Sequence, residues 1–179
     1  MKTTQIVIAG FGGQGILFSG KFLAYKGLLE DLQVSWLPSY GPEMRGGTAN
    51  CNVILSSEPI GSPIVTRPDV LIAMNLPSLQ KYVDAVVPGG QIYVDSTLIA
   101  EKVARTDLEV FYIPATAMAH DAGVPTLANM VMMGHVLQHK DVYKRQGPRQ
   151  GGHRGAEKRN SDLRQAAHRP LQVSPDRRV

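Results

Sequence analysis

Two glycine-rich loops hold the residues whose types and spacing suit recognition chemistry. The first reads GFGGQG over residues 10–15, and the second reads SYGPEMRGG over residues 39–47. In the second loop Glu43 and Arg45 stand two residues apart, and a guanidinium makes forked contacts with a carboxylate or a phosphate. A solvated pair of surface charges would not need the proline and glycines that shape this backbone. We therefore interpret the second loop as one that grips a partner or an anion.

The first loop matches the pattern G-x-G-x-x-G, with Gly10, Gly12 and Gly15 in the glycine positions. A dinucleotide-binding fold also needs an acidic residue at the end of its second strand, where this sequence has LPS. A P-loop would continue with Lys-Ser/Thr, which is absent. Two interpretations stay open: the glycines only permit a tight turn, or they let another molecule approach the backbone. The amide of Gln14, which is both donor and acceptor, favours the second.

The elements that must position these loops follow from the apolar runs between them. Short apolar or β-branched runs predict strands over residues 5–10, 33–40, 48–57, 69–75, 89–96 and 108–115. Apolar residues near helical spacing predict helices over residues 15–30, 76–86 and 123–140. This alternation predicts an α/β fold: a mainly parallel sheet with helices on both faces, a Rossmann-like three-layer arrangement. Both loops then open at the carboxyl edge of the sheet, where such folds bind ligands.

Each of the two longer predicted helices has an expected apolar side. In the first, Gly27 is a tolerated flaw among the apolar residues Ile16, Leu17, Phe22, Leu23, Tyr25 and Leu28. In the last, one side is formed by Leu127, Met130, Val131, Gly134 and Leu137.

The two loops together, GFGGQG and SYGPEMRGGTANCNV, resemble the gamma subunit or gamma domain of the 2-oxoacid:ferredoxin oxidoreductases. Members of that family share a G-x-G-G-Q-G loop and an S-Y-G-x-E-x-R-G-G loop. The likeness continues through DVLIAMN, GGQIYVDS and ANMVMMG and covers about residues 4–139. It looks most like the 2-oxoglutarate enzyme, and these motifs separate it only weakly from the pyruvate and branched-chain enzymes.

The resemblance implies a complex that decarboxylates a 2-oxoacid oxidatively, passes the acyl group to coenzyme A and reduces ferredoxin in an anaerobic or microaerobic prokaryote. Alpha and beta subunits would hold thiamine diphosphate and Mg²⁺, and iron–sulfur clusters would lie in another subunit or domain. Cluster ligation needs four cysteines, and this chain has only Cys51. We therefore expect an accessory subunit that is not catalytic by itself, has no catalytic or metal-binding residue and holds no cofactor of its own.

We expect this subunit to dock on the catalytic subunits near the point where coenzyme A enters, with Arg45 facing a coenzyme A phosphate or a partner carboxylate. The expected binding or docking residues are Gly12, Gly13, Gln14, Gly15, Ser39, Tyr40, Gly41, Glu43, Arg45, Gly46 and Gly47. The alternative is a free-standing nucleotide- or dinucleotide-binding module with a Rossmann-like first unit.

Several other residues suggest chemistry but have a plainer interpretation. His120 beside Asp121 is expected to be a surface or capping residue in a loop, and Cys51 is expected to pack as a small apolar group. Asn75 and Asp95 end predicted strands at the binding edge, where they either line a pocket or, for Asn75, cap the following helix.

The last predicted helix carries two further groups of this kind. His135, His139 and Asp141 have helical spacing for a metal site, but nothing else in the sequence supports ligation. Three methionines are expected in the core or at a subunit contact: Met130, Met132 and Met133.

Composition and charge bound the remaining possibilities. The 179 residues are 43% hydrophobic, which fits one globular domain. The N-terminus lacks the apolar stretch of a secretion signal, and no apolar run approaches the roughly 20 residues that span a bilayer. We expect a cytoplasmic protein with neither a membrane nor a nucleic acid as partner.

The formal charge of +4 resides in one part of the chain. Residues 1–140 carry 9 Lys and Arg against 11 Asp and Glu, whereas residues 141–179 carry 10 against 4. The latter segment has few large apolar residues and no period, so we expect it to be a disordered tail. It is either a basic arm for nucleic acid or an acidic partner, or an artefact. The artefact is suggested because DVYKRQ can be encoded by GATGTGTATAAGAGACAG, which resembles a transposase adapter. We interpret residues 1–140 as the gamma-type domain and 141–179 as adapter-derived or frame-shifted sequence, so we expect the natural C-terminus to be missing.

Overall fold

The sheet at the centre of the fold has six strands in the order β2-β3-β1-β4-β5-β6. A computed structural model describes residues 3–39 and 48–139, and the predicted tail of residues 141–179 lies outside them. The strands are β1 Thr3–Phe11, β2 Gln33–Ser39, β3 Thr48–Ser56, β4 Val70–Ala73, β5 Gln91–Asp95 and β6 Glu109–Ile113.

Strands β1, β4, β5 and β6 run parallel, as their pairings show. Strand β3 is antiparallel to both of its neighbours, β1 and β2. Because β2 is reversed twice relative to β1, it runs in the same direction and ends at the same edge of the sheet. The mainly parallel sheet is thus confirmed, although β3 separates β1 from β2.

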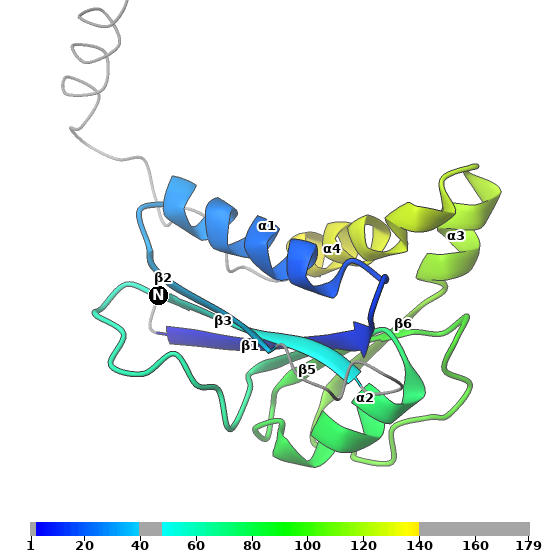
Figure 1. The fold of residues 1–179 in the computed structure, drawn as a ribbon. Helices are drawn as coiled ribbons and strands as arrows, with labels where there is room; N and C mark the ends of the chain where they lie inside the picture. The colour runs from blue at the N-terminus through cyan, green and yellow to red at the C-terminus, as the bar shows by residue number, and fades with distance from the viewer. Residues whose placement is uncertain (1–2, 40–47, 140–179) are drawn as a thin grey trace, which may run out of the picture. The chain divides into compact units, whose positions relative to one another are not determined.

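Helices cover both faces of this sheet, which confirms the predicted layers. Helices α1 (Ile16–Leu29) and α4 (Ala128–His139) lie on one face, and α2 (Leu76–Tyr82) lies on the other (Figure 1). The remaining elements are short: η2 Val83–Ala85 extends α2, α3 Ala115–Asp121 packs against α4, and η3 Pro125–Leu127 leads into α4.

The central strands supply a core on each side of the sheet because their side chains alternate. In β1, Ile6 and Ile8 belong to one buried cluster, with Leu23 of α1. Val7 and Ala9 belong to the cluster on the other side, with Leu79 of α2. Strand β4 is buried at all four positions, as expected for a parallel strand covered on both faces.

Two features of the last third of the chain differ from the sequence predictions. Helix α3 was not predicted, and it contains His120, which was expected in a loop. The buried residues of α4 are Asn129, Met132, Met133 and Val136 rather than the side predicted from Leu127 to Leu137. The cause is that α4 is apolar on several sides, so spacing alone does not select the side that faces the sheet.

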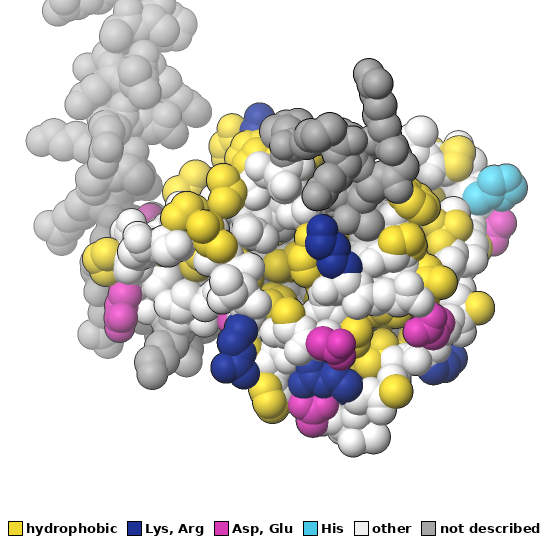
Figure 2. All heavy atoms as spheres, turned by 60° about the horizontal axis from the view of Figure 1, so that its bottom comes forward, with side chains coloured by type: hydrophobic (Ala, Val, Ile, Leu, Met, Phe, Trp, Pro, Cys, Tyr) yellow, Lys and Arg dark blue, Asp and Glu magenta, His cyan; other side chains and the backbone are white. Residues whose placement is uncertain are grey.

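The face that carries α2 bears charged side chains. Figure 2 shows basic and acidic side chains next to one another on this face. Arg105 donates from Nη1 to the carbonyl oxygens of Val83 and Val86 at 2.9 and 2.8 Å, and its Nη2 lies 2.6 Å from Oδ2 of Asp107. In the described part of the chain, no helix has both the length and the apolar character needed to cross a membrane.

Candidate functional site

The glycine loop joins β1 to α1 at the carboxyl edge of the sheet. Gly15 is the N-cap of α1 and has a left-handed backbone, with φ of 72° and ψ of 21°. No side chain caps this helix, so the N–H groups of its first turn have no side-chain acceptor from the N-cap. Gly12 and Gly13 are exposed, so the loop presents its backbone there, next to the exposed side chain of Phe11.

The side chain of Gln14 makes two hydrogen bonds that join the glycine loop to neighbouring backbone. Its Oε1 accepts a hydrogen bond from the backbone N–H of Phe11 at 2.6 Å, and its Nε2 donates to the carbonyl oxygen of Met74 at 3.0 Å. Met74 directly follows β4, so this amide bridges the ends of two neighbouring strands. The sequence led us to expect a donor and an acceptor offered to another molecule, but both ends of the amide are engaged within the chain.

A residue that sequence reasoning missed, Asn129 of α4, completes the loop. Its Nδ2 donates to the carbonyl oxygen of Gly15 and to Oγ of Ser19, both at 3.3 Å. Oγ of Ser19 also donates to the Gly15 carbonyl, at 3.1 Å. A Cβ on Gly15 would lie 2.5 Å from Nδ2 of Asn129, so both the backbone angle and the available space require glycine here. The available signal was a polar amide at the start of an otherwise apolar helix.

The two polar residues at the ends of β4 and β5 have structural roles. Asn75 caps α2, with its Oδ1 accepting from the N–H of Ser78 at 2.9 Å. Asp95 is fully buried, and its carboxylate accepts from the N–H of Thr97 at 3.1 Å and from Oγ1 of Thr116 at 2.6 Å. Asp95 thus fastens β5 to the start of α3, and of the two readings for Asn75 the structure shows the helix cap.

The ends of the charged loop lie beside the glycine loop. Thr48, where β3 begins, pairs with Phe11, and Ser39, where β2 ends, pairs with Asn50. The residues between them, 40–47, lie outside the described residues, and they include the predicted site residues Tyr40, Gly41, Glu43, Arg45, Gly46 and Gly47. The sheet therefore brings both ends of this segment to the edge where Gly12, Gly13, Gln14 and Gly15 are found.

Cys51 lies in the core, where its thiol has no access to solvent. Its Sγ donates to the carbonyl oxygen of Ile16 at 3.5 Å. Burial raises the pKa of the Cys51 thiol to about 12. A single buried thiol of this kind does not fit the four thiolates that an iron–sulfur cluster requires.

The remaining candidates do not assemble a reactive centre in the described ranges. His120 and Asp121 are both exposed, with Nδ1 and Oδ1 3.7 Å apart. Nδ1 of His139 hydrogen-bonds to the carbonyl oxygen of His135 at 2.9 Å, and Asp141 lies outside the described residues. Within residues 3–39 and 48–139, no three His, Cys, Asp or Glu side chains are grouped to hold a metal.

Comparison with known proteins identifies the family of this chain. A family model described as Pyruvate ferredoxin/flavodoxin oxidoreductase matches residues 5–157. This chain belongs to that family. Its members include subunits of 2-oxoacid-oxidising complexes, so the chain is related to oxidoreductases.

Two relatives show how the family divides by substrate. The ketoisovalerate oxidoreductase subunit VorA of Methanothermobacter thermautotrophicus is 45% identical over 133 residues, which are 74% of this chain. The match spans only 28% of that relative's length. The 2-oxoglutarate synthase subunit KorC of Methanocaldococcus jannaschii is 34% identical over 145 residues, with 79% of this chain and 78% of the relative covered.

Solved structures of family members share the fold. The keto/oxoacid ferredoxin oxidoreductase gamma subunit of Geobacter sulfurreducens superimposes with a TM-score of 0.71 at 28% identity, covering 79% of this chain and 78% of that one. The 2-oxoglutarate:ferredoxin oxidoreductase of Magnetococcus marinus, solved with 2-oxoglutarate, coenzyme A and succinyl-CoA, gives 0.73 at 27% identity, covering 80% of this chain and 25% of that one. The resemblance to gamma subunits is confirmed.

Proposed function

We propose that this chain is the gamma subunit of a 2-oxoacid:ferredoxin oxidoreductase that converts 2-oxoglutarate to succinyl-CoA, and that it is not catalytic by itself. The observation that carries the proposal is that polar side chains at the carboxyl edge of the sheet hydrogen-bond within this chain. Gln14, Asp95 and Asn129 all bind groups of this chain. The exposed backbone of the glycine loop is then what meets a partner.

The choice of 2-oxoglutarate is supported by the relative KorC, because 78% of its length is matched. VorA has the higher identity but is matched over 28% of its length, and its name gives ketoisovalerate. Since the proposed subunit does no chemistry on the 2-oxoacid, its partners would make the selection. The competing substrate is therefore 2-oxoisovalerate, and an assay of the complex decides between the two.

The proposed partners are alpha and beta subunits that hold thiamine diphosphate and Mg²⁺, together with an iron–sulfur subunit that reduces ferredoxin. The gamma subunit would assemble on them and shape the side of the active site that coenzyme A enters. Coenzyme A and succinyl-CoA are bound in the Magnetococcus marinus complex, which supports this choice of acyl acceptor. A cytoplasmic location is part of the proposal, in keeping with a single buried cysteine that has no disulfide partner.

The test of this function is reconstitution of the complex. The full chain is co-expressed with the subunits encoded beside it, captured by an affinity tag and assayed for coenzyme-A-dependent ferredoxin reduction. We expect a brown complex that is most active with 2-oxoglutarate among pyruvate, 2-oxoglutarate and 2-oxoisovalerate. A colourless chain that purifies alone and restores no activity would contradict the proposal and favour the nucleotide-binding module.

The proposed role of the charged loop has its own test. Arg45→Ala should weaken assembly or raise the KM for coenzyme A, because a forked contact to a phosphate or carboxylate is lost. Arg67→Ala serves as a control, since Arg67 is exposed in the connection between β3 and β4. If Arg45→Ala changes neither assembly nor this KM, the charged loop is not a docking element.

A further inference from the structure

Helix α1 packs several small residues against the sheet, together with Ile16 and Leu23, and leaves other large apolar residues outside. The buried residues include Ser19, Gly20, Ala24 and Gly27. A Cβ on Gly20 would lie 2.4 Å from Sγ of Cys51, so the helix sits close to β3. An ordinary surface helix turns its large apolar side chains inward, whereas α1 is apolar on its outward side as well.

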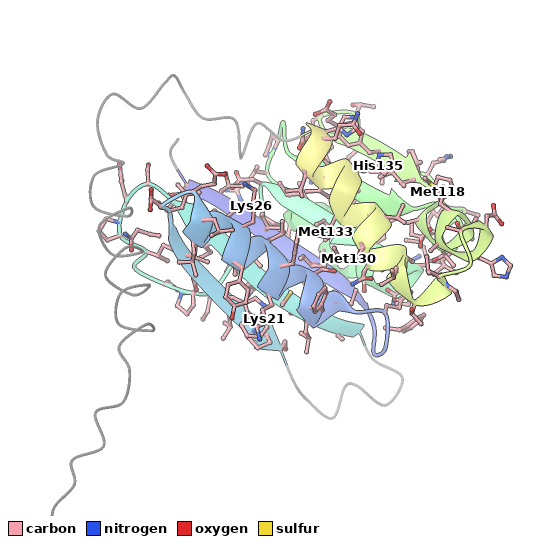
Figure 3. The ribbon with its side chains drawn as sticks, turned by 90° about the horizontal axis from the view of Figure 1, so that it is seen from above. Lys21, Lys26, Met118, Met130, Met133 and His135 are labelled. Carbon is pink, nitrogen blue, oxygen red and sulfur yellow. The ribbon has the colours of Figure 1, made fainter. Side chains whose placement is uncertain are left out.

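The outward side of α1 is strongly apolar. Phe18, Tyr25, Leu28 and Leu29 are 60%, 58%, 55% and 79% exposed. Lys21 lies on the same side, with its Nζ 5.7 Å from the centre of the Tyr25 ring. Figure 3 looks down on this layer and shows Lys21 and Lys26 on α1, beside α4 with Met130, Met133 and His135. A helix that is apolar all round is typically buried, which points to a partner over this side.

We propose that these five residues, here called the α1 face (Phe18, Lys21, Tyr25, Leu28 and Leu29), form the surface on which another subunit of the oxidoreductase complex docks. The partner places apolar side chains against the four apolar residues of the α1 face. It places a carboxylate near Lys21. This inference rests on the proposed function, because it assigns a surface to the assembly that the function requires.

The size of the α1 face argues for a partner whose contact extends beyond this face, rather than for a dimer in which two α1 faces meet. Its four apolar side chains expose roughly 500 Å² at the stated fractions, whereas a stable interface buries about 800 Å² per partner. The remaining area is available at the N-terminal end of α1, where Phe11 is 44% exposed at the start of the glycine loop. A partner that covers the α1 face and continues onto this loop, where the proposed function places docking, therefore buries more area than two α1 faces that meet each other.

Labelling of an introduced cysteine tests the α1 face directly, because the natural thiol of Cys51 is buried and is not expected to react. Cys51 is the sole cysteine of the chain and is buried. The variant Leu29→Cys places one reactive thiol on the α1 face of the full chain. The matched control is Ile64→Cys, since Ile64 is 61% exposed and lies in the connection between β3 and β4. Maleimide labelling is measured for each variant alone and in the reconstituted, active complex.

We expect Leu29→Cys to be labelled in the isolated chain and protected at least roughly tenfold in the complex, as for a fully desolvated interface position. Ile64→Cys should be labelled equally in both. Equal labelling of Leu29→Cys in an active complex would overturn the inference while leaving the proposed function intact. Failure of any complex to form would overturn both. Protection in the isolated chain would also overturn it: concentration-dependent protection would indicate a second copy, and concentration-independent protection would indicate a segment of this chain.

The charge of Lys21 gives a second, independent measurement. Lys21→Glu should weaken binding to the other subunits about tenfold or more, because a carboxylate would then face a carboxylate. Lys21→Arg retains the charge and should bind as the natural chain does. If Lys21→Glu binds with unchanged affinity, the partner presents no carboxylate here and that part of the inference is wrong.

Discussion

Asn129 of α4 donates a hydrogen bond from Nδ2 to the carbonyl oxygen of Gly15, 3.3 Å away at the start of α1. The two residues are 114 positions apart in the sequence. Gly15 is also the position at which a Cβ would collide with that same amide. The shape of the glycine loop therefore depends on the last described helix as well as on its own glycines.

This contact predicts that substitutions at the two positions are coupled. Asn129→Ala should lower the free energy of unfolding by about 0.5–1.5 kcal/mol, because the hydrogen bonds from Nδ2 to Gly15 and Ser19 are lost while the Gly15 carbonyl still accepts from Ser19. Gly15→Ala should cost at least about 1 kcal/mol from its positive φ alone, in addition to the clash. In the double variant the clash with Nδ2 is gone, so urea denaturation should show a loss smaller than the sum of the two.

The control for this coupling is Gly13→Ala. Gly13 also has a positive φ, 91°, but a Cβ there would meet nothing within 4 Å. Combining it with Asn129→Ala should give additive losses, within about 0.5 kcal/mol. Additive losses for the Gly15 pair as well would show that the amide moves aside without cost.

A second prediction concerns the amide of Gln14. Gln14→Glu keeps an oxygen for the N–H of Phe11 but turns a carboxylate oxygen toward the carbonyl oxygen of Met74, where a donor now lies. We expect a loss of about 1–3 kcal/mol at neutral pH. Acidification should recover part of it, because a protonated carboxyl group has an O–H donor. Gln138→Glu, at an exposed position of α4, should change little; an equal loss there would point to helix charge instead.

A third prediction concerns the thiol of Cys51, whose pKa burial raises from 9.0 to about 12. Because the folded pKa is the higher one, the stabilisation by this group is fully present below pH 9 and is lost as pH rises toward 12. At pH 8 the native chain should therefore react very little with a thiol reagent such as Ellman's reagent. The urea-unfolded chain should release one equivalent of thionitrobenzoate per chain. Rapid reaction of the folded chain would contradict the buried position of Cys51.

Much of the fold followed from local pattern. The runs around Ile6 to Ala9 and Val70 to Ala73 predicted buried strands because parallel strands covered on both faces are apolar throughout. The glycine loop was placed correctly between a strand and a helix. The short helix α3 escaped prediction because seven residues are too few to show a period, and Asp95, a residue distant in sequence, holds its first turn.

The candidate site was less accessible to sequence reasoning, for a physical reason. A loop motif shows which residues are present but not which of their polar groups are already occupied. Gln14 was expected to face outward, yet Met74, 60 residues away, accepts its amide. Asn129 was missed because its partner is 114 residues distant. Contacts of this kind arise only when the sheet brings strand ends together.

The same limit applies to the glycines of the helices, and it yields the last prediction. Gly27 was taken as a tolerated flaw in α1, since glycine in a helix costs about 0.5–1 kcal/mol relative to alanine. In the fold, a Cβ on Gly27 would lie 2.6 Å from Cδ2 of Leu55 and 3.0 Å from Cγ2 of Val34. Overpacking should therefore cost Gly27→Ala about 1–3 kcal/mol of stability. The gain in helix propensity offsets part of this cost, so the net effect should be destabilising.

Gly134 of α4 provides the matched comparison, because a Cβ there would meet nothing within 4 Å. Gly134→Ala should stabilise the chain by about 0.5–1 kcal/mol, since only the propensity effect remains. Urea denaturation of both variants measures the difference in sign. If both substitutions stabilise, α1 can move away from β3 at little cost, and glycine at position 27 does not reflect close approach. If only Gly134→Ala does, glycine at position 27 is required by the close approach of α1 to Leu55 of β3 and Val34 of β2.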